Sequence, residues 1–190
     1  MTLQTPLRTA ILLFAVLFFV SGVIYPILVT GIGELTFSSQ AHGSLVRDSN
    51  GTVIGSTLIG QNFAGPYYFQ GRPSATSGSP YNAGQSGGSN LGPSNPVLAE
   101  RVNFTINSLS GQGIKGPWPG DLVTASASGL DPHITLEAAL AQVTAVTRAR
   151  GMTEEDVRAL VLSEVIGSSV PFHPQYVNVL SLNRALDGEG

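Results

Sequence analysis

The chain has 190 residues, a net charge of −3, 23 glycines, 12 prolines and no cysteine. Its nine lysines and arginines form no cluster, so the composition argues against a surface that neutralises nucleic-acid phosphates. The lack of cysteine excludes a disulfide framework and a zinc site built on thiolates.

An uncharged, apolar segment from Thr9 to Gly33 is the first element of the chain. Its 25 residues would form a helix about 37 Å long, enough to cross a hydrocarbon core of about 30 Å. Pro26 removes the N–H donor that would bond the carbonyl of Gly22, which predicts a kink. We therefore expect an N-terminal tail at residues 1–8, a transmembrane helix at 9–33 and one domain at 34–190.

Arg8 decides the expected orientation, because the other end of the apolar segment has no lysine or arginine before Arg47. This asymmetry favours a cytoplasmic N-terminus and an extracytoplasmic domain. A cleaved signal peptide is the alternative, since Ser39-Gln40-Ala41 resembles a cleavage site that would release a secreted binding domain after Ala41. The apolar segment is longer than the roughly 7–15 residues of a signal-peptide core, which favours a retained single-pass anchor.

The domain begins with a predicted hairpin over Ser44–Ile59, in which Asn50-Gly51 supplies the two positive-φ residues of a type I′ turn. From Gly60 to Pro96 the chain is rich in glycine, serine, asparagine and proline, with no strand or helix period. Loops of this length are functional or disordered, and the aromatic residues within this one need burial. We expect an ordered, functional loop.

The rest of the domain mixes helices with short strands, so the expected fold class is α+β with a single mixed domain and a long irregular loop. In chain order we expect a helix from Asn95-Pro96 to about Ser108, a strand at Leu122–Thr124, a helix capped by Thr135 and ended by Gly151, a helix with a Thr153/Asp156 capping box, a strand containing Val177 and Val179, and a short helix at Ser181–Leu186.

One motif suggests an enzyme. Gly84-Gln85-Ser86-Gly87-Gly88 matches the G-x-S-x-G nucleophile elbow, so a membrane-anchored extracytoplasmic serine hydrolase using Ser86 is an alternative function. The elbow requires a strand before the serine and a helix after it, and both flanks are expected to be loop. The three histidines, His42, His133 and His173, have no carboxylate at metal-ligand spacing. We therefore predict no catalytic residue, no metal site and no cofactor of the chain's own.

Several short motifs are similar, in order and spacing, to those of one known family. They are Gly60-Gln61-Asn62-Phe63, Gly71-Arg72-Pro73-Ser74-Ala75-Thr76, Tyr81-Asn82, Ser86–Pro96, Asp121–Asp131, and Val177–Leu180 with Leu182-Asn183. Over nearly its whole length the chain resembles the KdpC family, the C subunit of the bacterial Kdp potassium-transporting P-type ATPase.

This resemblance implies an accessory subunit of ATP-driven, high-affinity potassium uptake in the bacterial inner membrane. The implied partners are KdpA, which selects potassium, KdpB, which hydrolyses ATP, and the small KdpF, which stabilises the assembly. Potassium would be the transported ion, and ATP would act through the complex. The family is described as a catalytic chaperone that raises the ATP affinity of KdpB, sometimes through an SGGS-type segment, here Ser86–Ser89.

An extracytoplasmic domain cannot reach ATP across about 30 Å of hydrocarbon, so any effect on ATP affinity would pass through conformational states of the complex. We predict instead that the long loop docks on the outer surface of KdpA or lines an ion path. Its candidate residues are polar or small: Gln61, Asn62, Arg72, Ser74, Tyr81, Asn82, Ser86, Gly87, Gly88, Ser89 and Asn90. The alternative is that they only fix the turns of the loop itself.

Overall fold

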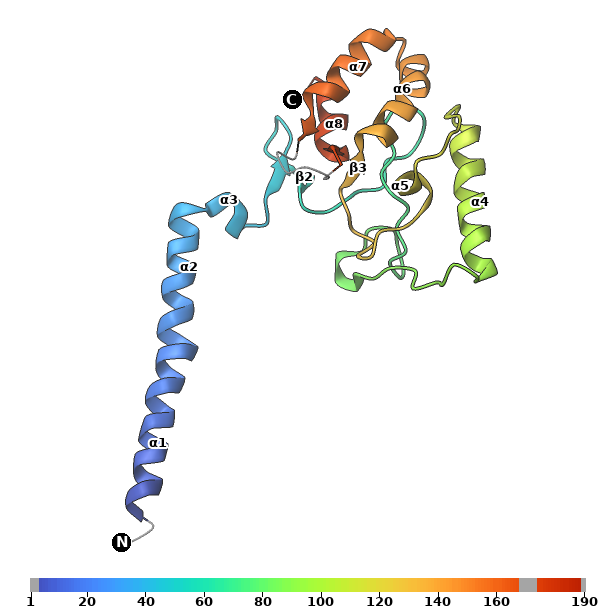
Figure 1. Ribbon diagram of the computed structural model, residues 1–190. Helices are drawn as coiled ribbons and strands as arrows, with labels where there is room; N and C mark the ends of the chain where they lie inside the picture. The colour runs from blue at the N-terminus through green and yellow to red at the C-terminus, as the bar shows by residue number, and fades with distance from the viewer. Residues whose placement is uncertain (1–3, 168–173, 189–190) are drawn as a thin grey trace. The chain divides into compact units, whose positions relative to one another are not determined.

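A computed structural model describes residues 4–167 and 174–188 of the chain. The chain forms two compact units, Met1–Ser44 and Leu45–Gly190 (Figure 1). The first is helical and the second combines helices with small antiparallel sheets, which confirms the α+β class expected from the sequence.

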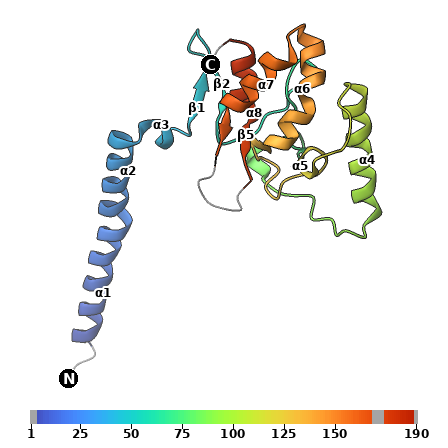
Figure 2. The same cartoon turned by 45° about the horizontal axis from the view of Figure 1, so that its top comes forward.

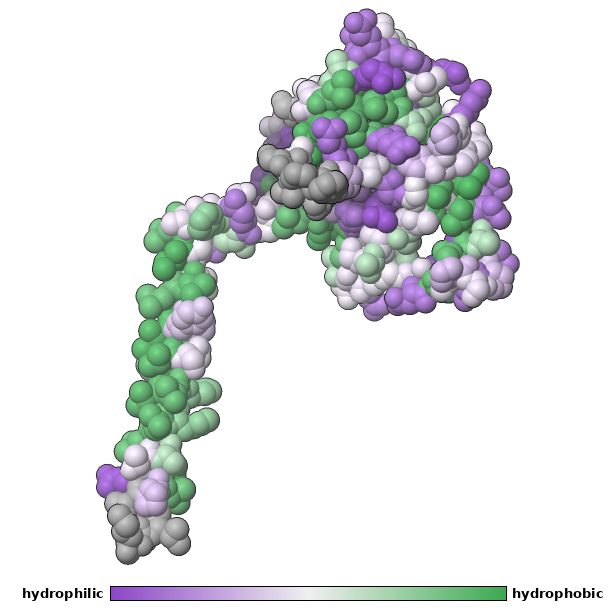
Figure 3. Space-filling model, in the orientation of Figure 1, coloured by the Kyte–Doolittle hydropathy of each residue, from purple (hydrophilic) through white to green (hydrophobic). Residues whose placement is uncertain are grey.

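The first unit contains α1 (Gln4–Phe19), a π-helical turn η1 (Val20–Ile24), α2 (Tyr25–Thr36) and α3 (Ser38–Ala41). The helix from Pro6 to Thr36 has 31 residues and is long and apolar enough to cross a membrane, as Figure 3 shows by its hydrophobic colouring. The helix continues through Pro26 because the preceding turn is π-helical and therefore wider than an α-helical turn. In this turn the Tyr25 N–H bonds the carbonyl of Val20, five residues earlier.

The second unit contains, in chain order, β1 (Leu45–Arg47), β2 (Val53–Ser56), the 3₁₀ turn η2 (Ala83–Gln85), α4 (Pro96–Gly111), α5 (Gly120–Val123), β3 (His133–Thr135), α6 (Leu136–Arg150), α7 (Glu154–Ser163), β4 (Val165–Ile166), β5 (Tyr176–Asn178) and α8 (Val179–Leu186). Between β2 and α4 the chain has no regular element except η2, which confirms the long irregular loop.

The antiparallel pair β1–β2 confirms the predicted hairpin, but the predicted type I′ turn is wrong. Of the pair Asn50-Gly51, only Gly51 has a positive φ, 80°. The carboxylate of Asp48 accepts the Asn50 N–H at 2.9 Å, and the Asp48 carbonyl accepts the Gly51 N–H at 3.0 Å. This side chain therefore stabilises a longer turn with one left-handed residue and a register shift in β1.

The predicted helix caps are confirmed. The side chains of Asn95, Thr135 and Thr153 each accept a hydrogen bond from a backbone N–H in the first turn of α4, α6 and α7 respectively. Gly151 ends α6 in the left-handed conformation, with φ 69°. At the C-terminus, Val177 lies in β5 as predicted, whereas Val179 is the first residue of α8, which Asn178 caps.

The strand predicted at Leu122–Thr124 is wrong, because this segment lies in the short helix α5 and its C-cap. The Thr124 N–H and hydroxyl both bond the carbonyl of Gly120, at 2.9 and 2.6 Å, and these bonds close a helical turn. Leu122 is buried and Asp121 accepts the Thr135 N–H at 2.6 Å, so α5 is tied to the start of α6.

The core lies between a three-stranded antiparallel sheet, in the order β3-β5-β4, and the helices α6, α7 and α8. Ile134 pairs with Val177 across the sheet, and both are fully buried. Figures 1 and 2 show these three helices together in both views. The buried helical side chains include Ala138, Ala139, Val143 and Val146 on α6, Val157 and Val161 on α7, and Leu182 on α8.

Two buried carboxamides connect this core to the long loop. Asn183 of α8 accepts the Phe69 N–H at 2.8 Å and donates to the Phe69 carbonyl at 3.0 Å. Gln142 of α6 accepts the Gln70 N–H at 2.7 Å and donates to the Gln70 carbonyl at 3.1 Å. Both amides are almost fully buried, as is Phe69. The loop thus obtains from two side chains the backbone hydrogen bonds that a neighbouring strand would otherwise provide.

The replacement Asn183→Ala should destabilise the domain by about 2–6 kcal/mol, because it leaves two buried backbone groups of Phe69 without partners at about 1–3 kcal/mol each. Urea unfolding of the detergent-solubilised chain measures the loss. Asn103→Ala, on the exposed side of α4, is the control and should change stability by less than about 0.5 kcal/mol. Equal stability of the two variants would contradict the role of the amide.

Candidate functional site

The segment Ala125–Asp131, between α5 and β3, is the support on which the long loop is built. Its carbonyl groups accept hydrogen bonds from loop donors that are far apart in the sequence. The Gly60 N–H bonds the Leu130 carbonyl at 2.8 Å, the Ser74 hydroxyl bonds the Gly129 carbonyl at 2.7 Å, and the Gly87 N–H bonds the Ser128 carbonyl at 2.8 Å. The loop is therefore held along its length by hydrogen bonds to the backbone carbonyls of this support.

Arg72 fixes the centre of the loop on this support. Its guanidinium forms an ion pair with Asp131 at 3.1 Å and donates to the Ala125 carbonyl at 3.4 Å. Asp131 also accepts the His133 N–H at 3.0 Å. The hydrogen bonds of His133 to the Asp131 carboxylate, together with the nearby guanidinium, hold the pKa of Asp131 below its ordinary value, although partial burial acts against this. The carboxylate is thus kept ionised for the ion pair.

Tyr81 closes the loop back on itself. Its hydroxyl donates to the Arg72 carbonyl, and its ring and hydroxyl occupy the space that a Cβ would need at Gly60 and Gly71. Its backbone is left-handed, with φ 56°. Burial, and secondarily the charge of Asp131, raise the pKa of the phenol to about 12. These contacts explain why glycine stands at two positions of the loop where another side chain would collide with Tyr81.

Ser74, Thr76 and Asn82 form a hydrogen-bonded turn beside Tyr81. The Ser74 hydroxyl accepts the Tyr81 N–H at 2.9 Å, and the Thr76 hydroxyl accepts the Asn82 N–H at 3.1 Å. The Asn82 amide donates to the Ser77 carbonyl and caps η2. Gln61 serves the hairpin instead: it donates to the Ile54 carbonyl at 2.6 Å. These candidate residues all have contacts within the chain.

Ser86 lacks the setting of a hydrolase nucleophile. It follows the 3₁₀ turn η2 rather than a strand, the segment after it is not helical, and its hydroxyl donates to the Ser128 carbonyl at 3.1 Å. Gly87 and Gly88 lie against the support, where a Cβ at Gly88 would come within 3.0 Å of the Ala127 carbonyl oxygen. The pattern G-x-S-x-G here arises from close backbone packing, and the geometry does not favour the hydrolase alternative.

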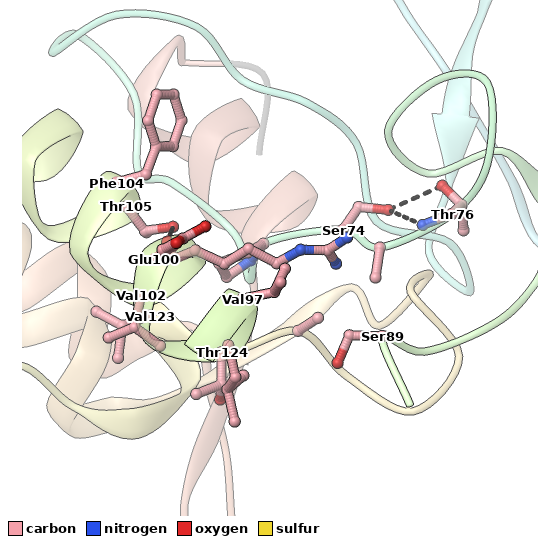
Figure 4. Close-up of a pocket in the computed structure, with 15 residues that line it drawn as sticks. Ser74, Thr76, Ser89, Val97, Glu100, Val102, Phe104, Thr105, Val123 and Thr124 are labelled. Carbon is pink, nitrogen blue, oxygen red and sulfur yellow. Dashed lines mark hydrogen bonds between the residues drawn. The ribbon is translucent and has the colours of Figure 1, made fainter. Parts of the chain in front are cut away.

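Asn62, Ser86 and Asn90 are the exposed members of the candidate set. Asn90 adopts a left-handed backbone, with φ 52°. Ser89 lines a groove of about 550 Å³ between the loop, α4 and the end of α5. Figure 4 shows Ser74, Thr76 and Ser89 from the loop facing Val97, Glu100 and Thr105 from α4, with Val123 and Thr124 below. Of the sequence-predicted residues, Ser74 and Ser89 line this groove.

Phe104 of α4 lies at one end of the groove, and its side chain is 76% exposed. Phe104 also lines a second hollow of about 190 Å³, together with Gln61, Asn62, Arg72 and Tyr81. Pro73, Ser74 and Thr105 also belong to both hollows, so the two are adjacent. The loop and α4 thus present one continuous surface with polar sides and an exposed aromatic ring.

The described residues contain no group of three or more His, Cys, Asp or Glu side chains that could hold a metal ion. His133 contacts the Asp131 carboxylate, and its ring lies edge-on to Tyr176 at 4.9 Å. His42 lies 3.5 Å from the carboxylate of Glu34. His173 lies outside the described residues.

Sequence reasoning missed four residues on which the site depends: Asn183, Gln142, Asp131 and Phe104. Gln142 could have been found from the sequence. It lies three residues after Ala139 and one before Val143, which are apolar residues on one face of the helix predicted between Thr135 and Gly151. A polar side chain on such a face must find a partner in the core. The exposure of the Phe104 ring could not be predicted from the sequence, because the periodicity of α4 does not show which apolar residue stays exposed.

Tyr81 provides a test of this geometry. A raised pKa means that the folded state favours the neutral phenol, so its contribution to stability is complete below pH 10, the ordinary pKa, and is lost as the pH rises through about 12. Ultraviolet titration of tyrosinate should show a late transition near pH 12 that Tyr81→Phe abolishes. Tyr67→Phe, whose ring is 56% exposed, is the control and should keep it. Persistence of the late transition in Tyr81→Phe would contradict the assignment.

Comparison with known proteins identifies the family. The family model described as "KdpC: K+-transporting ATPase, c chain" matches residues 7–188. Proteins named potassium-transporting ATPase KdpC subunit are 53% identical in Methanosphaerula palustris, covering 99% of this chain and 100% of the relative, and 52% identical in Dechloromonas aromatica, covering 97% and 98%. One from Geobacter sulfurreducens is 49% identical, covering 95% and 96%. The chain therefore belongs to the KdpC family, the subunit of the potassium-transporting ATPase that the motifs of its loop indicated.

Proposed function

We propose that the chain is a single-span accessory subunit of the Kdp complex whose domain, residues 34–190, lies outside the cytoplasm and docks on the channel-like KdpA subunit. The apolar helix of 31 residues supports the membrane anchor. Arg8 at its beginning, with no lysine or arginine between it and Arg47, supports the orientation. Potassium is the ion that the complex carries, and the chain contributes no cofactor to its transport.

The exposed aromatic surface between the loop and α4 is the observation that supports docking best. A ring that is 76% exposed costs solvation in a free domain, and aromatic residues are enriched where protein interfaces exclude water. Asn62 and Ser89, which line the two hollows, provide hydrogen-bonding groups for the rim of such an interface. The loop is already fixed by Arg72 and Tyr81, so little ordering entropy is lost on docking.

In this proposal the domain stabilises the assembly of KdpA, KdpB and KdpF. An influence on the ATP affinity of KdpB, the chaperone role implied by the family, then acts through conformational states of the complex. Such coupling requires only that the domain bind one state more tightly than another. Direct nucleotide contact by Ser86–Ser89 would require the opposite topology.

Labelling of introduced cysteines tests the orientation, because the natural chain has none. Ser77→Cys, at an exposed loop position, should react in intact cells with a maleimide that cannot cross the membrane. Thr2→Cys, in the N-terminal tail, should react only after lysis. Reaction of Thr2→Cys but not Ser77→Cys in intact cells would reverse the proposed topology and make direct contact with ATP the better hypothesis.

Phe104→Ala tests the docking surface. The exposed ring adds little to the fold, so stability should change by about 0.5 kcal/mol or less, whereas loss of an interface anchor worth at least about 2 kcal/mol should weaken association about 30-fold. Recovery of the complex on a tagged chain, with potassium uptake at low external potassium, measures this loss. Leu162→Ala on α7, 52% exposed, is the matched control. Wild-type assembly by Phe104→Ala would remove this surface from the proposal.

A further inference from the structure

The membrane helix contains a backbone carbonyl that its own helix does not satisfy. The Tyr25 N–H, which would bond the Ser21 carbonyl in a regular α-helix, is donated to Val20. The next donor along the chain, which a π-helical pairing would use, belongs to residue 26, and proline has no N–H. The Ser21 hydroxyl does not compensate, since it donates to the Leu17 carbonyl at 2.6 Å.

The unsatisfied Ser21 carbonyl costs free energy because it lies near the middle of the predicted membrane span. Ser21 lies 15 residues from Pro6 and 15 from Thr36 (21 − 6 and 36 − 21), at the centre of the apolar helix. At about 1.5 Å per residue, each end is about 22 Å away, beyond the roughly 15 Å half-thickness of the hydrocarbon core. Headgroups and bulk water therefore do not reach it, and an unsatisfied carbonyl at this depth costs several kcal/mol.

The local shape leaves room for a donor from outside the helix. Gly22 follows Ser21, and a Cβ added at Gly22 would have only one atom near it, a ring carbon of Phe18 at 4.0 Å. A neighbouring backbone can approach closely where a side chain is missing, which is the reason that small residues occur at contacts between membrane helices.

From these observations we infer that the segment Ser21–Pro26 is the contact site for a membrane helix of another subunit of the ATPase, which supplies a hydrogen-bond donor to the Ser21 carbonyl. The partner side chain is a hydroxyl, carboxamide or indole at the same depth, since these groups donate without carrying a charge into the membrane. A second parallel copy of this chain would bring to this depth the Ser21 hydroxyl, already donated to Leu17, and the Tyr25 phenol, and the crosslinking below distinguishes such a copy from another subunit. The inference rests on the membrane anchor of the proposed function and not on the docking surface.

Paired substitutions in the full chain, co-expressed with the other subunits, test the contact. Gly22→Leu adds a bulky side chain to the residue next to Ser21, and Pro26→Ala restores an N–H donor to the helix. Their controls are Gly31→Leu, at a glycine with no atom within 4 Å of an added Cβ, and Pro6→Ala, in the first turn, where no helical donor is needed. The two test variants should retain about three- to tenfold less of the other subunits after extraction in mild detergent. Equal retention by all four variants would overturn the inference.

Photocrosslinking provides a readout that does not depend on loss of assembly. Gly22→Cys, labelled with a benzophenone maleimide, should crosslink to another subunit of the ATPase in native membranes. Ile24→Cys, about 200° around the helix at a similar depth, should do so much less. Crosslinks from Gly22→Cys only to a second copy of this chain, or only to lipid, would refute the proposed partner.

An alkaline wash of the membranes separates failure of this contact from failure of the anchor. Release of the wild-type chain by the wash would refute the membrane span, and with it both proposals. Retention of every variant, combined with equal assembly, would refute the helix contact alone and leave the docking surface of the domain unaffected.

Discussion

The exchange of hydrogen bonds between two buried carboxamides and the Phe69–Gln70 backbone is the constraint on which the domain depends most. A loop of this length has many backbone N–H and C=O groups and no neighbouring strand, so any part of it that enters the core needs side-chain partners. Asn183 and Gln142 provide them from two different helices. Because Phe69 is thereby fixed in the core, Arg72, three residues later, reaches Asp131 of the support in a defined position. Tyr81, twelve residues later, then bonds the Arg72 carbonyl.

This arrangement divides the polar residues of the loop into two groups. Gln61, Arg72 and Ser74 use their donors and acceptors within the chain, whereas Asn62 and Asn90 face solvent. In the proposed docking, we therefore expect the first group to shape the surface and not to contact the partner directly. Internal turn fixing, one of the two roles expected from the sequence, is observed for the first group. Partner contact stays a prediction for the second group.

Features set by neighbouring residues could be predicted from the sequence, and features set across the chain could not. Thr135 and Gly151 bound α6 as expected, because a cap and a left-handed stop involve only adjacent turns. The prediction of a type I′ turn at Asn50-Gly51 was wrong because the hydrogen bond to the Asp48 carboxylate outweighed the preference of the Asn-Gly dipeptide for that turn. The pairing of Asn183 with Phe69 spans more than a hundred residues, and no local pattern shows which buried amide meets which stretch of loop.

The geometry of Ser86–Ser89 also bears on how the domain could affect ATP binding. A glycine-rich loop that cradles phosphate must direct free backbone N–H groups at the anion. Here the Gly87 N–H is donated to the Ser128 carbonyl at 2.8 Å, and the Gly88 backbone packs against Ala127. The glycines therefore serve close packing between two stretches of chain, and opening them to a phosphate would break the contacts that hold the loop. An influence on the nucleotide affinity of another subunit is better explained by preferential docking to one conformation of the complex, which needs no nucleotide contact at all.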